Sequence, residues 1–338
     1  MLAEYERYFQ KLATLLQKND LGEEYIRASD NGGQYFSKGI KLYRYNCLQS
    51  KFDLKRIILI VPSLFNSPNI LFINKTKNFV ECLQDIATVY LIDWQEIKSP
   101  DHKLDDYVFE IIELLKYLIK NFAYKIDLIG HCIGGTLSLV AANLHPELLN
   151  SVTLLNTPWN FSYLEPQRII CKQLQFDEAI KHLDQVPKIY QQMLFFLLNP
   201  EHYQKKIVKF FETLNRDRQG LEIFLKTEYW LFSGKNLPRT TYLQLTEQIV
   251  DQNILEQNKW FIGDKLVSDL KIKLPVCIVA AERDNIAPLT STISLLKIIK
   301  SSTLIKVDGG HISYLISSKI NNFFAEYKYW FSSCNREK

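Results

Sequence analysis

The chain has 338 residues, of which 47% are hydrophobic and 23% charged, and its formal net charge is +4. This composition is typical of a packed globular protein and excludes disordered and fibrous classes. Basic and acidic residues are interspersed, which argues against nucleic acid as a partner. The first residues lack the order of a secretory signal and no apolar run is long enough for a transmembrane segment, so we expect a cytoplasmic protein.

Near the N-terminus, apolar residues recur at helical spacing and predict an amphipathic helix. Such a helix could dock a partner, but it more often covers the core of its own chain, which is the interpretation we favour. We assign residues 1–46 to an N-terminal segment that contains this helix and a first strand region. The apolar residues are Leu2, Tyr5, Phe9, Leu12, Leu15 and Leu16.

From residue 56 onward, short apolar runs alternate with amphipathic stretches. Their nearly continuous apolar character predicts strands that are buried on both faces of a parallel sheet. The alternation of strand and helix predicts a doubly wound, mostly parallel α/β sheet. The predicted strands span 56–62, 87–93, 125–131, 151–158, 274–284 and 302–311, and the clearest helices span 104–120 and 134–144.

The stretch from Asp127 to Thr136 is the most informative in the chain. It reads G-x-C-x-G-G, with Cys132 between a predicted strand and a predicted helix. This is the context of a nucleophile elbow, in which an α/β-hydrolase carries its nucleophile on a sharp turn flanked by small residues. The helix that follows directs unpaired amides toward the sulfur, which favours the thiolate, and we expect the sulfur to be exposed at this turn.

Two backbone amides are candidates for an oxyanion hole. The amide of Ile133 directly follows the nucleophile, and we expect it to stabilise negative charge on a substrate carbonyl oxygen. A second donor should come from the loop after the first core strand, where we choose the amide of Leu64.

The strand pattern stops between residues 159 and 269 and then resumes. We interpret this segment as a mostly helical cap inserted into an α/β-hydrolase core that comprises 47–158 and 270–338. A separate domain is the alternative.

A thiol nucleophile needs a general base and an acid that orients it. His311 follows the last predicted strand in a glycine-containing loop, and Asp284 ends the preceding strand. The order Cys132, Asp284, His311 predicts a triad at the carboxyl edge of the sheet. Glu282 and Asp93 are the competing acids, and His131, which adjoins Cys132, is more simply explained by packing.

The cysteines are widely spaced, with no CxxC pair and no Cys/His spacing that suits a metal, so we predict no metal site. In a reducing compartment they should be free thiols. They are Cys47, Cys82, Cys132, Cys171, Cys277 and Cys334.

Taken in chain order, the motifs resemble the polyhydroxyalkanoate synthases, especially the short catalytic subunits that work with a second protein. Asn285 differs from the family, in which a histidine usually follows the acid, and His131 stands at a variable position. The matching segments are VPSLFN at 61–66, VYLIDW at 89–94, LDDY at 104–107, GHCIGG at 130–135, EYWLF at 228–232, AERDN at 281–285 with Pro288, and GGHI at 309–312.

The resemblance implies an acyltransferase that polymerises 3-hydroxyacyl-CoA into polyhydroxyalkanoate. Cys132 would carry the growing polyester chain as a thioester and release CoA. His311 would deprotonate Cys132, and Asp284 would orient His311 or help to activate the incoming 3-hydroxyl. The CoA thioester is a substrate and no cofactor is implied. A second synthase subunit, a homodimer formed through the cap and a place at the polyester granule surface are further expectations.

Two alternatives stay open. The same scaffold could serve a cysteine hydrolase, either a polyester depolymerase or a thioesterase, and a member without activity could be a granule-associated partner. Three separated triad residues argue against the second alternative, because drift would tend to erase one of them.

Overall fold

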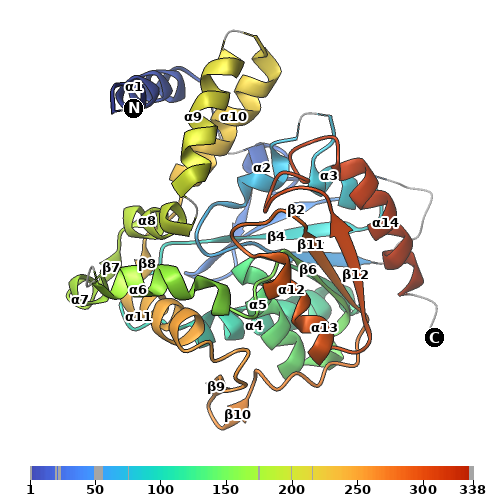
Figure 1. Ribbon diagram of the computed structural model, residues 1–338. Coiled ribbons are helices and arrows are strands. Elements are labelled where there is room, and N and C mark those ends of the chain that lie inside the picture. The colour runs from blue at the N-terminus through green and yellow to red at the C-terminus, as the bar shows by residue number, and fades with distance from the viewer. Residues whose placement is uncertain are drawn as a thin grey trace.

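The central feature of the fold is a mostly parallel sheet (Figure 1). The computed structural model describes residues 2–19, 21, 24–48, 56–74, 76–173, 176–198, 200–214 and 216–334. Within these residues eight strands form one sheet in the order β1-β2-β4-β3-β5-β6-β11-β12. They are β1 (Gln34–Tyr35), β2 (Ile40–Tyr45), β3 (Ile57–Val61), β4 (Thr88–Trp94), β5 (Ile126–His131), β6 (Leu149–Leu155), β11 (Val276–Ala281) and β12 (Ser302–Val307).

The strands from β4 to β12 in this order run parallel, whereas β1 and β2 join antiparallel at one edge. The strands β3, β5 and β11 are buried at every position, as expected where helices cover both faces of a sheet. The predicted α/β-hydrolase architecture is therefore confirmed. The sequence IKLYRY of β2 mixes polar and apolar residues, so the apolar runs did not reveal its bounds.

Helices cover both faces of this sheet. Side chains alternate along β3, so that Ile57 and Leu59 pack in the core with α4 and α5, whereas Ile58 and Ile60 pack in the core with α3 and α14. In the described part of the chain, none of the helices combines the length and apolar character that crossing a membrane requires. The helices around the sheet are α2 (Glu24–Arg27), α3 (Phe79–Gln84), α4 (Leu104–Phe122), α5 (Ile133–Leu144), α12 (Leu289–Ile293), α13 (Leu295–Ile298) and α14 (Ile320–Ser333), with the short turns η1 (Pro68–Phe72) and η2 (Pro146–Leu148).

A mostly helical segment leaves the sheet after β6 and returns at β11, in the region predicted to be the cap (Figure 1). Its limits as a separate unit, 159–269, stay a prediction. It contains η3 (Ser162–Leu164), α6 (Glu165–Gln173), α7 (Phe176–Ile180), β7 (Gln185–Val186), α8 (Lys188–Leu198), α9 (Pro200–Leu214), α10 (Arg218–Phe232), β8 (Leu237–Pro238), α11 (Arg239–Leu243), η4 (Gln244–Asp251), β9 (Phe261–Ile262) and β10 (Lys265–Leu266).

The N-terminal helix α1 (Leu2–Lys18) lies beside α9 and α10, which project away from the sheet (Figure 1). Tyr8 and Leu12 are buried against Ile207, Phe210 and Leu225 in a small separate core. The amphipathic helix thus covers part of its own chain, as favoured from the sequence. The side chains of its first predicted residues, Leu2 and Tyr5, lie outside the described set.

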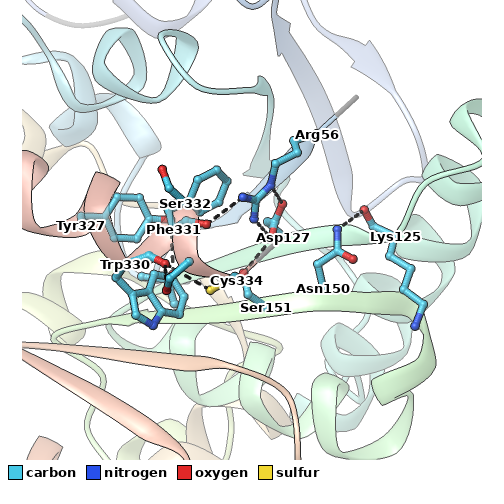
Figure 2. Close-up of polar contacts among 12 residues, drawn as sticks. Arg56, Lys125, Asp127, Asn150, Ser151, Tyr327, Trp330, Phe331, Ser332 and Cys334 are labelled. Carbon is cyan, nitrogen blue, oxygen red and sulfur yellow. Dashed lines mark hydrogen bonds and ion pairs between the residues drawn. The ribbon is translucent and has the colours of Figure 1, made fainter. Parts of the chain in front are cut away.

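A buried ion pair joins the C-terminal helix to the sheet (Figure 2). Asp127 of β5 accepts hydrogen bonds from Nε of Arg56 at 2.9 Å, from Nη2 of Arg56 at 2.6 Å and from the Ser151 hydroxyl at 2.7 Å. Nη1 of Arg56 donates to the carbonyl oxygen of Phe331 at 2.8 Å, and the guanidinium lies over the Phe331 ring. This cluster is at the end of β5 opposite Cys132, so it supports the fold without touching the candidate site.

Candidate active site

Cys132 occupies the turn between β5 and α5, as the motif predicts. Its φ of 54° and ψ of −129° are a conformation that residues other than glycine rarely adopt. The Cys132 amide donates to the carbonyl oxygen of Leu155 at 2.9 Å, which ties the turn to the neighbouring strand β6. Strain of this kind persists only where the surroundings enforce it, and it is common at functional sites.

The glycines around Cys132 are required by close contacts with neighbouring segments. A Cβ atom on Gly134 would lie 2.3 Å from the carbonyl oxygen of Pro62, and one on Gly135 would lie 1.9 Å from Oγ1 of Thr157. On Gly130 it would lie 2.4 Å from Cα of Gly135. Any side chain at these positions would therefore push α5 away from the sheet and change the turn that carries the thiol.

His311 and Asp284, the predicted base and acid, lie within hydrogen-bond distance of each other. Nδ1 of His311 lies 2.7 Å from Oδ2 of Asp284, and both side chains are buried. The other carboxylate oxygen of Asp284 accepts hydrogen bonds from the amides of Ile286 at 2.8 Å and Ala287 at 2.9 Å. The carboxylate is thus held by its own turn in the orientation that meets the imidazole.

The competing acids lie elsewhere. Glu282 is exposed, two residues before the buried Asp284. Asp93 accepts hydrogen bonds from Gln95 at 3.0 Å and from Nζ of Lys235 at 2.9 Å, so it fixes the end of β4 to the cap. Of the three candidate carboxylates, the one predicted is the one that contacts His311.

The charges at the site stabilise a protonated His311. Burial alone would lower the pKa of His311, but the Asp284 carboxylate and a negatively charged Cys132 raise it well above its ordinary value. Side-chain hydrogen bonds to Asp284 and to Cys132 act in the same direction. The arrangement therefore favours an imidazolium at His311, a group that can stabilise negative charge on a neighbouring nucleophile.

The thiol is more covered than the sequence suggests. We expected an exposed sulfur at the tip of the turn, whereas Cys132 is only 6% exposed. Tyr163, which begins the cap, is close enough for the charges of Cys132 and Asp284 to raise its pKa, after the larger effect of its own burial. The expectation was wrong because burial depends on the packing of segments that are distant in the sequence, which a local motif does not specify.

His131 packs against the candidate base. The two imidazole rings of His131 and His311 have centroids 5.3 Å apart, and His131 is almost fully buried. Burial, with a smaller effect of His311, lowers the pKa of His131 to about 3. His131 is therefore a neutral packing partner of His311, in agreement with the packing interpretation.

Asn156 supports the site although the motifs did not identify it. Its side-chain amide donates to the carbonyl oxygen of His311 at 2.7 Å, and its φ is 45°. Asn is one of the few residues that adopt this left-handed conformation. An asparagine directly after a strand of a parallel sheet is a signal that could have suggested this role.

The two predicted oxyanion donors lie in neighbouring segments. Ile133 is the first residue of α5, so its amide has no acceptor within the helix. Leu64 is buried in the loop after β3, whose start at Pro62 contacts Gly134. The loop and the helix therefore meet beside Cys132, and the roles of the two amides stay a prediction.

A pocket adjoins the loop that carries Leu64. It lies between this loop and the cap helices α8 and α10, with apolar and basic side chains together in its wall. The pocket is lined by Phe65, Asn66, Lys188, Gln191, Gln192, Lys206, Leu231, Phe232 and Gly234.

Among the described residues, no group of three or more His, Cys, Asp or Glu side chains is arranged to hold a metal ion.

The five cysteines whose side chains are described, Cys132 among them, are free thiols. The side chain of Cys171 lies outside the described set.

Comparison of the sequence and the fold with known proteins gives a consistent result. The model of the alpha/beta hydrolase fold family matches residues 56–317. A hydrolase from Pseudomonas aeruginosa has a TM-score of 0.57 at 14% identity, over 88% of this chain and 97% of its own. An alpha/beta hydrolase fold protein from Chitinophaga pinensis has a TM-score of 0.56 at 13% identity, over 92% and 100%.

Curated relatives give a narrower comparison than the fold does. The poly(3-hydroxyalkanoate) polymerase subunit PhaC of Haloferax mediterranei is 27% identical over 90% of this chain and 66% of its own length. The protein of the same name from Haloarcula marismortui is 28% identical over 81% and 60%, so the chain spans less than two thirds of these two relatives. The PhaC subunit of Thiocystis violacea is 26% identical over 84% of this chain and 82% of its own. The chain therefore belongs to the α/β-hydrolase fold family, and it is similar to PhaC subunits over most of its own length.

Proposed function

We propose that the chain is an acyltransferase that polymerises 3-hydroxyacyl groups from CoA thioesters into polyhydroxyalkanoate. The observation that carries this proposal is Cys132 on a strained turn at the edge of the sheet where Asp284 contacts the His311 imidazole at 2.7 Å. Similarity to PhaC subunits supports the same reaction class.

In the first step, His311 removes the proton from the Cys132 thiol and the thiolate attacks the carbonyl carbon of the acyl-CoA. The amides of Ile133 and Leu64 stabilise the negative oxygen of the tetrahedral intermediate. The carbon–sulfur bond to CoA then breaks, and the departing CoA thiolate takes the proton from His311. The product is a thioester on Cys132, formed with little change in free energy because one thioester replaces another.

In the second step, the 3-hydroxyl of an incoming 3-hydroxyacyl-CoA attacks the carbonyl carbon of the Cys132 thioester, and the bond from that carbon to the Cys132 sulfur breaks. His311 accepts the hydroxyl proton while the new carbon–oxygen ester bond forms, and the departing thiolate recovers that proton. The elongated acyl-CoA then acylates Cys132 again as in the first step, so each cycle lengthens the polyester by one unit and releases one CoA. Asp284 stabilises the imidazolium that exists in both steps.

The pocket beside Leu64 supports the choice of substrate. Phe65, Leu231 and Phe232 offer an apolar wall, and Lys188 lies in the same lining, whereas the amine of Lys206 is paired with Glu228 at 2.7 Å. An apolar wall with a basic residue beside it suits the pantetheine arm and a phosphate of CoA. Since Cys132 is only 6% exposed, we propose that the cap moves to admit the thioester.

The discriminating experiment supplies 3-hydroxybutyryl-CoA and measures CoA release together with the acyl product. A synthase gives an ester-linked oligomer and a hydrolase gives the free hydroxy acid, so free acid without oligomer would reject the synthase in favour of a thioesterase or depolymerase. Cys132→Ala is the control and should release no CoA above background. A thiol-directed acyl probe that labels the protein but not Cys132→Ala argues against a non-catalytic, granule-associated role.

Partners and location remain proposals. A second synthase subunit, a homodimer through the cap and association with the polyester granule are each consistent with the family. Sedimentation of the protein with and without 3-hydroxybutyryl-CoA tests for the homodimer, and a mass that stays that of one chain throughout would reject it. Co-sedimentation with isolated granules tests the location.

A further inference from the structure

The first residues of the cap, 159–163, which we call its stem, are hydrogen-bonded to the turn that carries Asp284, the candidate acid. The hydroxyl of Tyr163, in η3, donates to the carbonyl oxygen of Ile286 at 2.6 Å. The amide of the same Ile286 donates to Oδ1 of Asp284 at 2.8 Å. Ile286 therefore accepts a hydrogen bond from the cap through its carbonyl oxygen and donates one to Asp284 through its amide.

A second hydrogen bond joins the same two segments a few residues further on. The amide of Trp159, at the exit of β6, donates to the hydroxyl of Ser291 in α12 at 3.2 Å. Trp159 is fully buried. The residues from Asp284 to Ser291 are thus attached to the cap stem at two points, while Asp284 itself faces His311.

The stem is also attached to the far end of the cap. Oδ1 of Asn253 accepts the amide hydrogen of Phe161 at 3.0 Å, and Nδ2 of Asn253 donates to Oδ1 of Asn160 at 3.1 Å. Phe161 stacks with Tyr163 at a centroid distance of 6.3 Å. A displacement of the cap at either end would therefore reach the turn at Asp284 through Tyr163.

We propose that Tyr163 is a positioning residue that couples the cap to the acid: by fixing the carbonyl of Ile286 it keeps Asp284 against His311, and so keeps His311 basic enough to hold the proton of Cys132. The proposal rests on the roles given above to these three residues. The Tyr163 hydroxyl suits the task because burial raises its pKa and keeps it a donor.

The test is the rate at which iodoacetamide alkylates Cys132 between pH 5 and 9, followed by peptide mass spectrometry. Tyr163→Phe removes the hydroxyl and leaves the ring. We expect alkylation at pH 7 to slow by about threefold to tenfold, the effect of losing one hydrogen bond, and the rise of the rate to move to higher pH. The control is Tyr329→Phe, on a tyrosine that is 81% exposed, which should match the wild type.

A folded Tyr163→Phe protein whose rates and pH profile equal those of Tyr329→Phe would overturn the proposal. A loss of packing alone lowers thermal stability and does not move the pH profile. If Tyr163→Phe does not fold, Ser291→Ala removes the second attachment and should shift the profile in the same direction, and an unchanged profile would again reject the coupling. His311→Gln distinguishes a failure of the proposed function from a failure of the coupling. If His311→Gln leaves the alkylation of Cys132 unchanged, the proposed mechanism fails. If His311→Gln slows alkylation but Tyr163→Phe leaves it unchanged, only the coupling fails.

Discussion

Nδ1 of His311 lies 2.7 Å from Oδ2 of Asp284, although the two residues follow different strands. Asp284 comes after β11 and His311 after β12, and these strands are parallel neighbours. Their carboxyl ends therefore meet at one edge of the sheet, where β5 also delivers Cys132. The adjacency of β11 and β12 brings together a carboxylate and an imidazole that are separated by 27 positions in the sequence.

The first prediction concerns the base. The pKa of His311 is raised well above its ordinary value of 6.5, so the imidazolium persists at neutral pH and can stabilise a thiolate there. Wild-type Cys132 should therefore react rapidly with iodoacetamide at pH 7. In His311→Gln the reaction should become fast only near the pKa of a free cysteine, about 8.5. Turnover of 3-hydroxybutyryl-CoA by this variant should fall by about 10² to 10⁴.

A control for this prediction is His182→Gln, which changes an exposed histidine in the cap. It should leave both the alkylation profile and turnover unchanged. Equal profiles for His311→Gln and the wild type would contradict the assigned role of His311.

The second prediction concerns the elbow. In Gly134→Ala the new methyl group would lie 2.3 Å from the carbonyl oxygen of Pro62 and 2.5 Å from that of Val61, and backbone oxygens cannot move aside cheaply. We expect the free energy of unfolding to fall by about 1–3 kcal/mol, measured by urea denaturation. Gly310→Ala is the stability control because its nearest contact is at 3.5 Å. Equal losses in the two variants would mean that Gly134 is not sterically required.

The third prediction concerns the buried ion pair in Figure 2. Asp127→Asn leaves the Arg56 guanidinium buried at 6% exposure without its counter-charge. We expect a loss of about 3–5 kcal/mol in the free energy of unfolding. Glu113→Gln, which breaks the exposed pair with Lys116, should cost less than about 1 kcal/mol. The account of the fold would be contradicted if both variants lost the same small amount.

The fourth prediction concerns pH-dependent stability. Burial raises the pKa of Glu110 to about 7, opposed by a hydrogen bond from Ser37 and aided by Asp106. The folded state therefore retains a proton that the unfolded state loses near pH 4.5, so this stabilisation is complete below pH 4.5 and is lost as pH rises through 7. From pH 5 to pH 8 the free energy of unfolding, measured by urea denaturation, should fall in both proteins. We expect the fall to be smaller in Glu110→Gln than in the wild type by about 2–3 kcal/mol. Equal losses would show that Glu110 is ionised in the fold.

Much of the fold and of the candidate site could be predicted because the information is local. The apolar runs gave the core strands, and the glycines around Cys132 follow from contacts that one tight turn must make. The pairing of Asp284 with His311 followed from their positions after consecutive strands of a parallel sheet.

Other features depend on how distant segments pack, and the sequence did not reveal them. Tyr163 reaches Ile286 only because the cap stem folds back over the turn after β11. Cys132 is also buried, where an exposed thiol was expected. The pairing of Arg56 with Asp127 depends on the register of β3 against β5 and on the position of α14.

The central claim is that Cys132 becomes acylated by the thioester substrate. The most direct test mixes the protein with 3-hydroxybutyryl-CoA, stops the reaction with acid within one turnover and maps the modified peptides by mass spectrometry. We predict a hydroxybutyryl group, or a short oligomer of it, on the peptide that contains Cys132 and on no other cysteine, and none in Cys132→Ala. An acyl group on another residue, or undiminished CoA release by Cys132→Ala, would contradict the account.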